Sequence, residues 1–471
     1  MKKAALFLAA AMLTCSVSCS SKNVETPYDA TSQGPAANTD NTTSGEKSHI
    51  TIAIAESPNT WGGWQHIGDR IEKLNKSDSP YTVEIKHYEF DEDDYNGDTS
   101  ISRLSMDILA GKAPDVVSAA PFQLNKFSRH GYLTDLSPLM DSGSGIVKSD
   151  LLDNVMESVN EDGKTNVIYP AFDVYTAAAK PEFVGDKENW TVNEAIAAYN
   201  SFSGDFLADM FTKYDIRHYF FNGVMLDSID CKSHTCDLDS SLVPVLGFLT
   251  QLPPMEKRLG DSTAIIGQIH DNSALVKEQQ ISGINQFYAS EILRTFGNEP
   301  MTFVGYPTNN GKGSYAEISC GFGIMENSKH KEEAWQAISE LFFSDGFQRE
   351  ISDYSYGVPV RKNTLESLLH PETTSDITSA EDASAGAKPP FGTSITASVE
   401  VPNGELMRLN SEQIRQLGDF LENLEIDPFV DPAMEQIIKE ESDYVFEGER
   451  TIDQCVNILQ NRIELYLSES Q

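Results

Sequence analysis

The chain has 471 residues, too many for one hydrophobic core, so we expect it to fold as two or three domains. Its 72 acidic and 35 basic residues give a formal net charge of −37. This charge argues against nucleic-acid binding, because phosphates are neutralised by clustered Lys and Arg. The apolar share of 39% predicts a folded globular body.

The N-terminus has the pattern of an export signal. Two lysines precede the apolar run Ala4–Leu13, which is too short to span a bilayer comfortably. Residues 16–21, SVSCSS, follow and resemble the bacterial lipobox. This resemblance implies cleavage before Cys19 and lipidation of that residue; Cys15 fits less well, and a plain secretory signal peptide is the alternative. We predict a signal peptide over residues 1–18 and a lipid anchor at the outer face of the cell membrane.

A polar segment separates this signal from the rest of the chain. Residues 19–48 are rich in Ser, Thr, Asn, Pro and Gly and have few large apolar side chains. Such a segment cannot bury enough apolar surface to order itself, so we predict a disordered, lipid-anchored tether. The folded body is therefore expected outside the cytoplasmic membrane and to begin near residue 49.

The first part of the body alternates between strand and helix patterns. His49–Ala55 is a near-continuous apolar run, which is typical of a parallel strand covered on both faces. The pattern predicts further strands at 80–88 and 113–119 and helices at 65–75, 100–110 and 123–130. This alternation predicts a doubly wound α/β sheet.

A strand, a polar turn and a helix recur late in the chain. Ile318–Ile324 is a short apolar run whose two glycines indicate a strand that another backbone approaches closely. Apolar residues at helical spacing follow over Glu332–Phe343. Because earlier strand and helix units are already in place, this stretch predicts a chain that re-enters a domain it had left.

Several strings resemble the extracellular solute-binding proteins of ABC importers, the sugar-type family 1 that includes maltose-binding proteins. They are ISRLSMDILAGKAPDVVSAAPF, FSRHGYLTDLSPLMD, GYPTNNGKGSYAEISCGFGIMENSKHKEEAWQAISELFFSDGFQ, YGVPVRKNTLE and the final helical pair beginning DPAMEQ. The resemblance covers about residues 49–468. It implies a periplasmic-binding-protein type II fold, with two α/β lobes, a ligand cleft between them and three interlobe crossings.

The resemblance also implies where the lobes begin and end. Lobe one is expected at 49–170 plus 320–356, and lobe two, with a helix-rich C-terminus, at 171–319 plus 357–471. The crossings are expected near Tyr169–Tyr175, Ala316–Cys320 and Tyr356–Val360. Ala177–Lys180 departs from the Tyr-Asn pair that many members carry there, which weakens the prediction of the pocket in lobe two.

Motifs for catalysis and metal binding do not stand out. The sequence has no His-Glu-x-x-His, Gly-x-Ser-x-Gly or Gly-x-Gly-x-x-Gly motif, so we predict no catalytic residues and no cofactor. The acidic run Asp91–Gly97 suggests a calcium loop, but Arg103 occupies the position of the closing Glu. We therefore predict a solvated loop there and no metal site.

The cysteines of the body divide into two kinds. Cys231 and Cys236 flank a predicted tight hairpin, and in an exported protein this spacing favours a disulfide. Cys320 and Cys455 lie in a predicted buried strand and a predicted helix, where we expect core thiols.

Aromatic residues carry the functional argument, because sugars present flat C–H faces ringed by hydroxyl groups. Trp61 and Trp64 lie in a Gly-rich loop after the first strand, and Phe122 follows the third strand. In open α/β sheets such loops line the ligand crevice. The loop is short, so we expect it to expose at least one indole to the cleft, with packing on its own lobe as the alternative.

Further candidate ligand contacts lie at or near the crossings. The resemblance implies a polar contact on the first crossing and a stacking aromatic in lobe two. The candidates are Asp173, Tyr175, Gln286, Phe287 and Tyr288, with Glu317, Phe322, Tyr356 and Arg361 beside the later crossings.

The sequence thus predicts a monomeric, lipid-anchored substrate-binding protein of an ABC transporter. It would capture a carbohydrate by hinge closure and deliver it to the transmembrane permease subunits, without making or breaking a bond. The alternatives are an exported glycosidase acting through two carboxylates, a surface adhesin, and a binding protein for a peptide or another polar solute.

Overall fold

The structure is a computed structural model. It describes residues 47–57, 61–91, 98–161, 163–185, 187–203, 205–207, 213–230, 235–252, 272–318, 320–370, 399–400, 406–407, 409–426 and 432–469. The predicted signal peptide, the lipidation site Cys19, most of the predicted tether and most of the acidic run lie outside these residues. No helix in the described ranges is long and apolar enough to cross a membrane.

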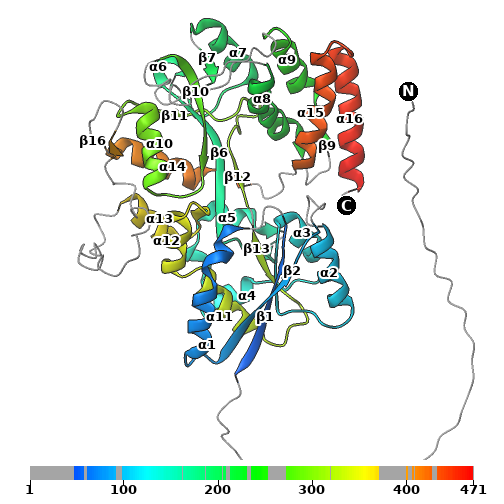
Figure 1. The fold of residues 1–471 in the computed structure, drawn as a ribbon, viewed down its shortest axis with the longest axis vertical. Coiled ribbons are helices and arrows are strands. Elements are labelled where there is room, and N and C mark those ends of the chain that lie inside the picture. The colour runs from blue at the N-terminus through cyan, green and yellow to red at the C-terminus, as the bar shows by residue number, and fades with distance from the viewer. Residues whose placement is uncertain are drawn as a thin grey trace, which may run out of the picture. The chain divides into compact units, whose positions relative to one another are not determined.

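The first sheet has the strand order β13-β3-β1-β2 (Figure 1). Its strands are β1 (Ser48–Ala55), β2 (Tyr81–Tyr88), β3 (Val116–Ala119) and β13 (Gly321–Ile324). β1 pairs in parallel with both β2 and β3, and its apolar run is explained by burial on both faces, since Ile52 and Ile54 on one face and Ala53 and Ala55 on the other are buried. β13 pairs antiparallel with β3, Gly321 opposite Ala119. The predicted return of the chain to its first sheet is therefore confirmed.

Helices and short elements surround this sheet. They are η1 (Gly62–His66), α1 (Gly68–Lys76), α2 (Asp98–Leu109), α3 (Pro121–Arg129), α4 (Ser137–Ser142), η2 (Lys148–Asp150), α5 (Asp153–Ser158), β4 (Asn160–Glu161), β5 (Lys164–Thr165), α11 (Lys331–Phe342) and α12 (Asp345–Asp353). Glycine is needed in β13, because a Cβ on Gly321 would lie 2.7 Å from Leu124 and one on Gly323 equally close to Leu133.

The second sheet has the order β11-β6-β10-β7, with β12 and β14 also paired to β6. Its strands are β6 (Ala171–Ala179), β7 (Asp205–Leu207), β10 (Ala274–Ile281), β11 (Thr302–Phe303), β12 (Tyr315–Glu317) and β14 (Val358–Pro359). β6 leads from the elements around β1 to those around β10 (Figure 1). It runs antiparallel to β10, β11, β12 and β14.

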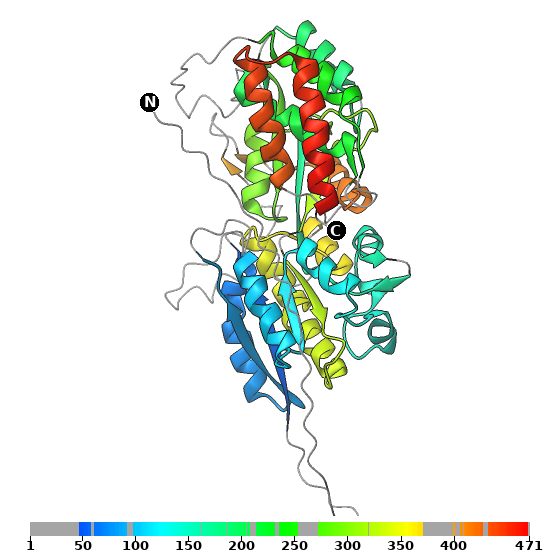
Figure 2. The ribbon, with the colours of Figure 1, turned by 90° about the vertical axis from the view of Figure 1, so that its right-hand side faces the viewer.

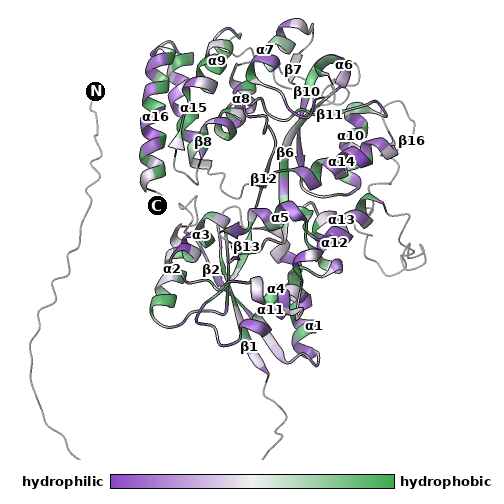
Figure 3. Cartoon of the chain, turned by 180° about the vertical axis from the view of Figure 1, so that it is seen from behind, coloured by the Kyte–Doolittle hydropathy of each residue, from purple (hydrophilic) through white to green (hydrophobic). Residues whose placement is uncertain are grey.

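The remaining elements follow β6 in the chain. They are α6 (Pro181–Val184), α7 (Val192–Ser201), α8 (Lys213–Ser228), β8 (Ile229–Asp230), β9 (Thr235–Cys236), α9 (Asp239–Leu249), α10 (Gln286–Phe296), α13 (Lys362–Leu369), β15 (Val399–Glu400), β16 (Leu406–Met407), α14 (Ser411–Asn423), α15 (Pro432–Phe446) and α16 (Ile452–Glu469). The last two form a side-by-side pair (Figure 2). Apolar and polar residues alternate along them, as expected for helices with one buried face (Figure 3).

The segments predicted as the second and third crossings both pair with the first, β6. Glu317 of β12 lies opposite Asp173 of β6, and Val358 of β14 lies opposite Phe172. Gln348 of α12 adds a buried link, because its amide donates to the carbonyl of Pro170 at 2.7 Å and accepts from the Val360 N–H at 2.9 Å. The boundaries between the two lobes stay a prediction.

Two buried tryptophans belong to the core. Trp335 of α11 is 0% exposed and Trp190 is 2% exposed. The Trp190 N–H donates to the carbonyl of Gly305 at 3.1 Å, so its polar edge is satisfied within the core. Both residues therefore contribute to the packing of the protein rather than to a ligand site.

Candidate ligand site

Polar and aromatic side chains gather where β6 and β12 run side by side. Asp173 and Tyr175 project from the same face of β6, because side chains alternate along a strand. In the strand register Tyr315 and Glu317 lie opposite Tyr175 and Asp173 respectively. The rings of Tyr175 and Tyr315 stack, with centroids 5.1 Å apart and planes 11° from parallel. The pairing thus brings together two predicted carboxylates and an aromatic surface.

The buried carboxyl group of Asp173 has too few hydrogen-bond partners to offset its loss of hydration. Its Oδ1 is buried and has no hydrogen-bond partner among the described residues. Burial raises the pKa of Asp173 to about 6, a hydrogen bond with Ser282 opposes this shift, and the charge of Glu317 adds to it. Burial, together with the charges of Glu317 and Asp173, also raises the pKa of Tyr175. This site therefore favours a ligand that donates hydrogen bonds to its carboxyl groups.

A cavity of about 430 Å³ lies at the carboxyl end of β10. This volume is within the usual range for small-molecule pockets. β10 and the turn after it contribute Lys277, Glu278, Gln279, Gln280, Ser282 and Gly283. The other walls are Tyr175 of β6, His218 of α8, Phe287, Tyr288 and Glu291 of α10, Tyr306 and Ser355.

The cavity contains carboxylates from both β10 and α10. Burial raises the pKa of Glu278, and the charge of nearby His218 opposes that shift. His218 in turn has its Nδ1 2.8 Å from Glu435, and this hydrogen bond raises the pKa of the imidazole. Burial likewise raises the pKa of Glu291, opposed by the charge of Lys277. Acceptors for hydroxyl protons therefore line the cavity beside its aromatic rings.

Three predicted residues lie at the start of α10. Asn285 caps this helix, its side chain accepting from the Tyr288 N–H at 3.1 Å, and so fixes the first turn beside β10. Phe287 lines the cavity and is 71% exposed, whereas Tyr288 lines it from a buried position. Gln286 is half-buried and is not among the lining residues.

The two tryptophans of the first loop differ in burial. Trp61 is only 6% exposed, its N–H donates to the Tyr356 carbonyl at 2.7 Å, and its ring packs edge-on against Phe347. Trp64 is half-buried and packs edge-on against Phe322 and Phe342. Trp61 is thus buried, contrary to the expectation for an exposed indole, whereas Trp64 keeps part of its surface exposed, and its contact with a ligand stays a prediction.

The glycines of this loop explain the difference. The Trp61 ring lies over Gly63 and the Tyr356 ring over Gly62, each so close that a Cβ would approach it to 2.5 Å. A loop without side chains at these positions can cover large rings with its own backbone. Tyr356 and Trp61 line a slot with Asp173 that is too narrow to hold a water molecule.

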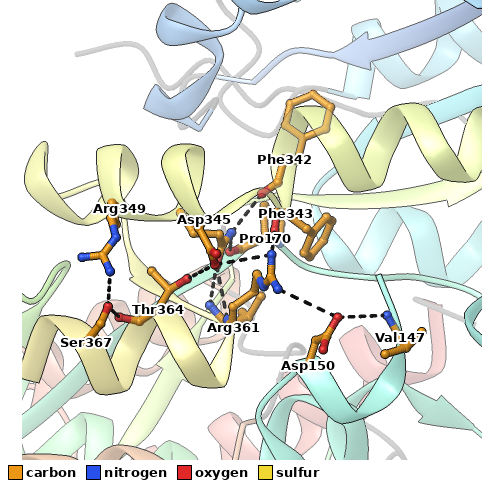
Figure 4. Close-up of polar contacts among 12 residues, drawn as sticks. Val147, Asp150, Pro170, Phe342, Phe343, Asp345, Arg349, Arg361, Thr364 and Ser367 are labelled. Atoms are coloured by element: carbon orange, nitrogen blue, oxygen red, sulfur yellow. Dashed lines mark hydrogen bonds and ion pairs between the residues drawn. The ribbon is translucent and has the colours of Figure 1, made fainter. Parts of the chain in front are cut away.

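Three other candidates lie outside the cavity. Phe322 is 0% exposed in the core of the first sheet, so its prediction as a ligand contact is wrong. Arg361 instead stabilises the segment after the third crossing: it donates to the Phe343 carbonyl at 3.0 Å and pairs with Asp345 at 3.4 Å (Figure 4). Phe122 is 43% exposed on α3, with the Lys126 ammonium 5.8 Å from its ring centroid.

The predicted hairpin around the cysteine pair is present. β8 pairs with β9, with Ile229 opposite Cys236. Cys236 is a free cysteine in the structure, Cys231 lies outside the described residues, and the disulfide stays a prediction.

We expect non-reducing peptide mapping of the exported protein to recover Cys231 and Cys236 in one cross-linked fragment; recovery of both as free thiols would contradict the bond. Cys320 and Cys455 are buried, as predicted.

Sequence reasoning missed most of the polar lining of the cavity. Glu278, Gln279 and Gln280 were not identified, nor were His218 and Glu291. One signal was available: the strand ALVKEQQI begins apolar and then carries four consecutive polar residues toward its carboxyl end. A strand that turns polar at its carboxyl end indicates a ligand site there.

With two α/β sheets, three paired crossing strands and a cavity beside them, the chain has the fold of the two-lobed solute-binding proteins. No family model and no curated protein matches the sequence. Most of the solved structures that it resembles are described as binding proteins rather than as enzymes.

Three solved structures illustrate the likeness. The extracellular solute-binding protein family 1 from Alicyclobacillus acidocaldarius has a TM-score of 0.55 and 14% identity, over 90% of this chain and 100% of that one. The sugar-binding protein MalE from Xanthomonas citri has a TM-score of 0.54 and 13% identity, over 90% and 98%. The cyclic α-maltosyl-1,6-maltose binding protein from Arthrobacter globiformis has a TM-score of 0.50 and 12% identity, over 90% and 100%. At these identities the likeness shows the fold.

Proposed function

We propose that this protein is the lipid-anchored substrate-binding component of an ABC importer and that it captures a carbohydrate. The observation that carries the proposal is the cavity at the carboxyl end of β10, which lies beside the Asp173, Tyr175 and Glu317 cluster on the paired crossings. A ligand bound there contacts the segments on which the two lobes hinge, so that binding favours the closed arrangement. The permease then receives the ligand from the closed protein.

The composition of the cavity supports a sugar as the ligand. Tyr175, Phe287 and Tyr306 provide apolar faces for stacking, and Glu278 and Gln280 provide hydrogen-bonding groups beside them. Two of the proteins that share the fold are described as binding a sugar or a maltose-type oligosaccharide. Anchoring through Cys19, hinge closure, delivery to a permease and a monomeric state belong to this proposal.

A thermal-shift screen tests the proposal. We expect neutral mono- and oligosaccharides, including maltose, maltotriose and cellobiose, to stabilise the body of the protein, because a ligand at 100 times its Kd adds about 2.7 kcal/mol. That gain corresponds to a rise in Tm of a few degrees in a protein of this size. Peptides, amino acids and a chromogenic glycoside complete the panel.

Two variants locate the site. Phe287→Ala removes an exposed ring of the cavity and is expected to weaken sugar binding about tenfold or more with little change in stability. Phe122→Ala is the matched control, since this ring is also exposed but lies on α3 and outside the cavity lining. Stabilisation by peptides alone would contradict the sugar ligand, turnover of the glycoside would indicate an enzyme, and no response at all would favour an adhesin.

A further inference from the structure

Two buried polar side chains in the cavity lack partners. Gln279 of β10 is 2% exposed, and neither its Nε2 nor its Oε1 has a hydrogen-bond partner in the part of the chain that the structure describes. Tyr288 of α10 is 3% exposed, and its hydroxyl is likewise unpartnered within those residues. Both residues line the same cavity. Three hydrogen-bonding atoms are therefore available to one ligand.

Leaving such atoms without partners is unfavourable in the free protein. A buried polar group without a hydrogen bond destabilises the folded state, whereas an apolar side chain of the same shape does not. Apolar residues fit at neighbouring positions, since Val276 and Ile281 of the same strand are both fully buried. The polar groups are thus not required by the packing of β10, and a bound ligand would satisfy them.

The hydrogen-bonding groups of the two side chains restrict the chemical class of the ligand. A primary amide presents a donor and an acceptor on one edge, and a phenol hydroxyl both donates and accepts. Neighbouring hydroxyl groups on a sugar ring offer the same two functions to the amide, and a third hydroxyl suits Tyr288.

The charges around Gln279 and Tyr288 disfavour the binding of an anionic ligand. Glu278 of β10 and Glu291 of α10 line the cavity, and the cations facing it are Lys277 and His218. His218 is hydrogen-bonded to the carboxylate of Glu435, which reduces its ability to attract a second anion. The carboxylates beside Gln279 and Tyr288 repel a uronate or phosphate group.

We propose that Gln279 and Tyr288 form a subsite that binds two neighbouring hydroxyls and a third hydroxyl of an uncharged sugar unit. The inference rests on the proposed function, because it assigns the specificity of the same cavity. Uronic acids and sugar phosphates are excluded by the flanking carboxylates, and deoxy sugars that lack one of the paired hydroxyls bind more weakly.

The test combines stability with binding. Gln279→Met and Tyr288→Phe are compared with the wild type in the full chain, first without ligand and then with maltose, maltotriose and cellobiose. We expect the Tm of each unliganded variant to equal or exceed that of the wild type. Binding of the neutral sugar should weaken about fivefold to tenfold for each variant, as expected for one or two lost hydrogen bonds.

Tyr219→Phe is the matched control for stability. Tyr219 is equally buried, but its hydroxyl donates to the Gly305 carbonyl at 2.6 Å and it lies outside the cavity. This variant should have a lower Tm and unchanged sugar binding. If Tyr288→Phe also loses stability, the Tyr288 hydroxyl has a structural partner and the inference is overturned.

The remaining outcomes separate this inference from the proposed function. Sugar binding that weakens in Phe287→Ala but not in Gln279→Met or Tyr288→Phe would overturn the subsite and leave the proposed function intact. Tighter binding of galacturonate or glucose 6-phosphate than of neutral sugars would overturn the assignment of an uncharged ligand. A wild type that binds none of the sugars would overturn both.

Discussion

Replacing Gly223 by Ala is expected to destabilise the protein by about 3 kcal/mol. Gly223 lies inside α8 against the backbone of Pro307, and a Cβ at this position would lie 2.1 Å from the Pro307 carbonyl oxygen. Neither the helix nor the main chain beside it can yield by rotating a side chain, so the two segments must separate. α8 also carries His218 to the cavity, and we therefore expect sugar binding to fall with stability.

Gly247→Ala is the control for this prediction. Gly247 also lies inside a helix, α9, but a Cβ there would meet no neighbouring group within 4 Å. Here Ala should stabilise the protein by up to about 1 kcal/mol through its higher helix propensity. Denaturant unfolding of the two variants measures the contrast. Equal changes in the free energy of unfolding at the two positions would show that contact with Pro307 is not the cause of the destabilisation by Gly223→Ala.

Asp173→Asn is expected to make the protein more stable at pH 7 and a weaker binder of its ligand. Burial raises the pKa of Asp173 from 3.8 to about 6. Between about pH 4 and 6 the folded protein therefore binds more protons at Asp173 than the unfolded chain does. The free energy of unfolding consequently falls as the pH rises through this range, and above pH 6 the destabilisation by the charged Asp173 is complete. A shift of about two pKa units sets an upper limit of about 3 kcal/mol for the gain, and we expect about 1–3 kcal/mol.

The pH dependence separates this effect from a general change in packing. The stability difference between Asp173→Asn and the wild type should be large at pH 7 and small at pH 4, where both side chains are uncharged in the folded protein. Asp353→Asn is the control for binding, because burial also raises the pKa of Asp353 to about 6 but this residue belongs neither to the cavity lining nor to the cluster of Asp173, Tyr175 and Glu317. It should gain stability and retain sugar binding. A variant of Asp173 that is less stable at pH 7 would contradict the prediction.

Much of the fold could be predicted from local patterns. The apolar run of β1 and the glycine-containing run of β13 are both typical of strands that are buried on both faces, so their sequences alone predict buried strands. Their pairing partners follow less directly from the sequence. The late strand and helix pattern indicated that the chain returns to an earlier domain, but not that β13 pairs with β3 in the register that places Gly321 opposite Ala119.

The site was predicted only in part, for a physical reason. Asp173 and Tyr175 are two positions apart on one strand and so share a face, and Phe287 lies in the first turn of a helix. Local spacing was therefore informative for these residues. Trp61 was misjudged because its burial depends on Gly63, which accommodates the ring, and on the distant Tyr356 carbonyl. Gln279 and Glu278 were missed because a polar residue in a strand usually faces solvent. Their burial depends on where α8 and α10 pack.

The position of β13 late in the sequence has a consequence for the order of folding. The first sheet contains strands from the beginning of the body and one strand that follows the whole of β6–β12, so β3 has a free edge until Gly321–Ile324 is available. Contacts between residues so distant in sequence form slowly, since the intervening chain must first be organised. We therefore expect the first sheet to be completed only after most of the chain has been made. Until β13 is added, the first sheet has an unpaired strand edge, which is open to pairing with another backbone.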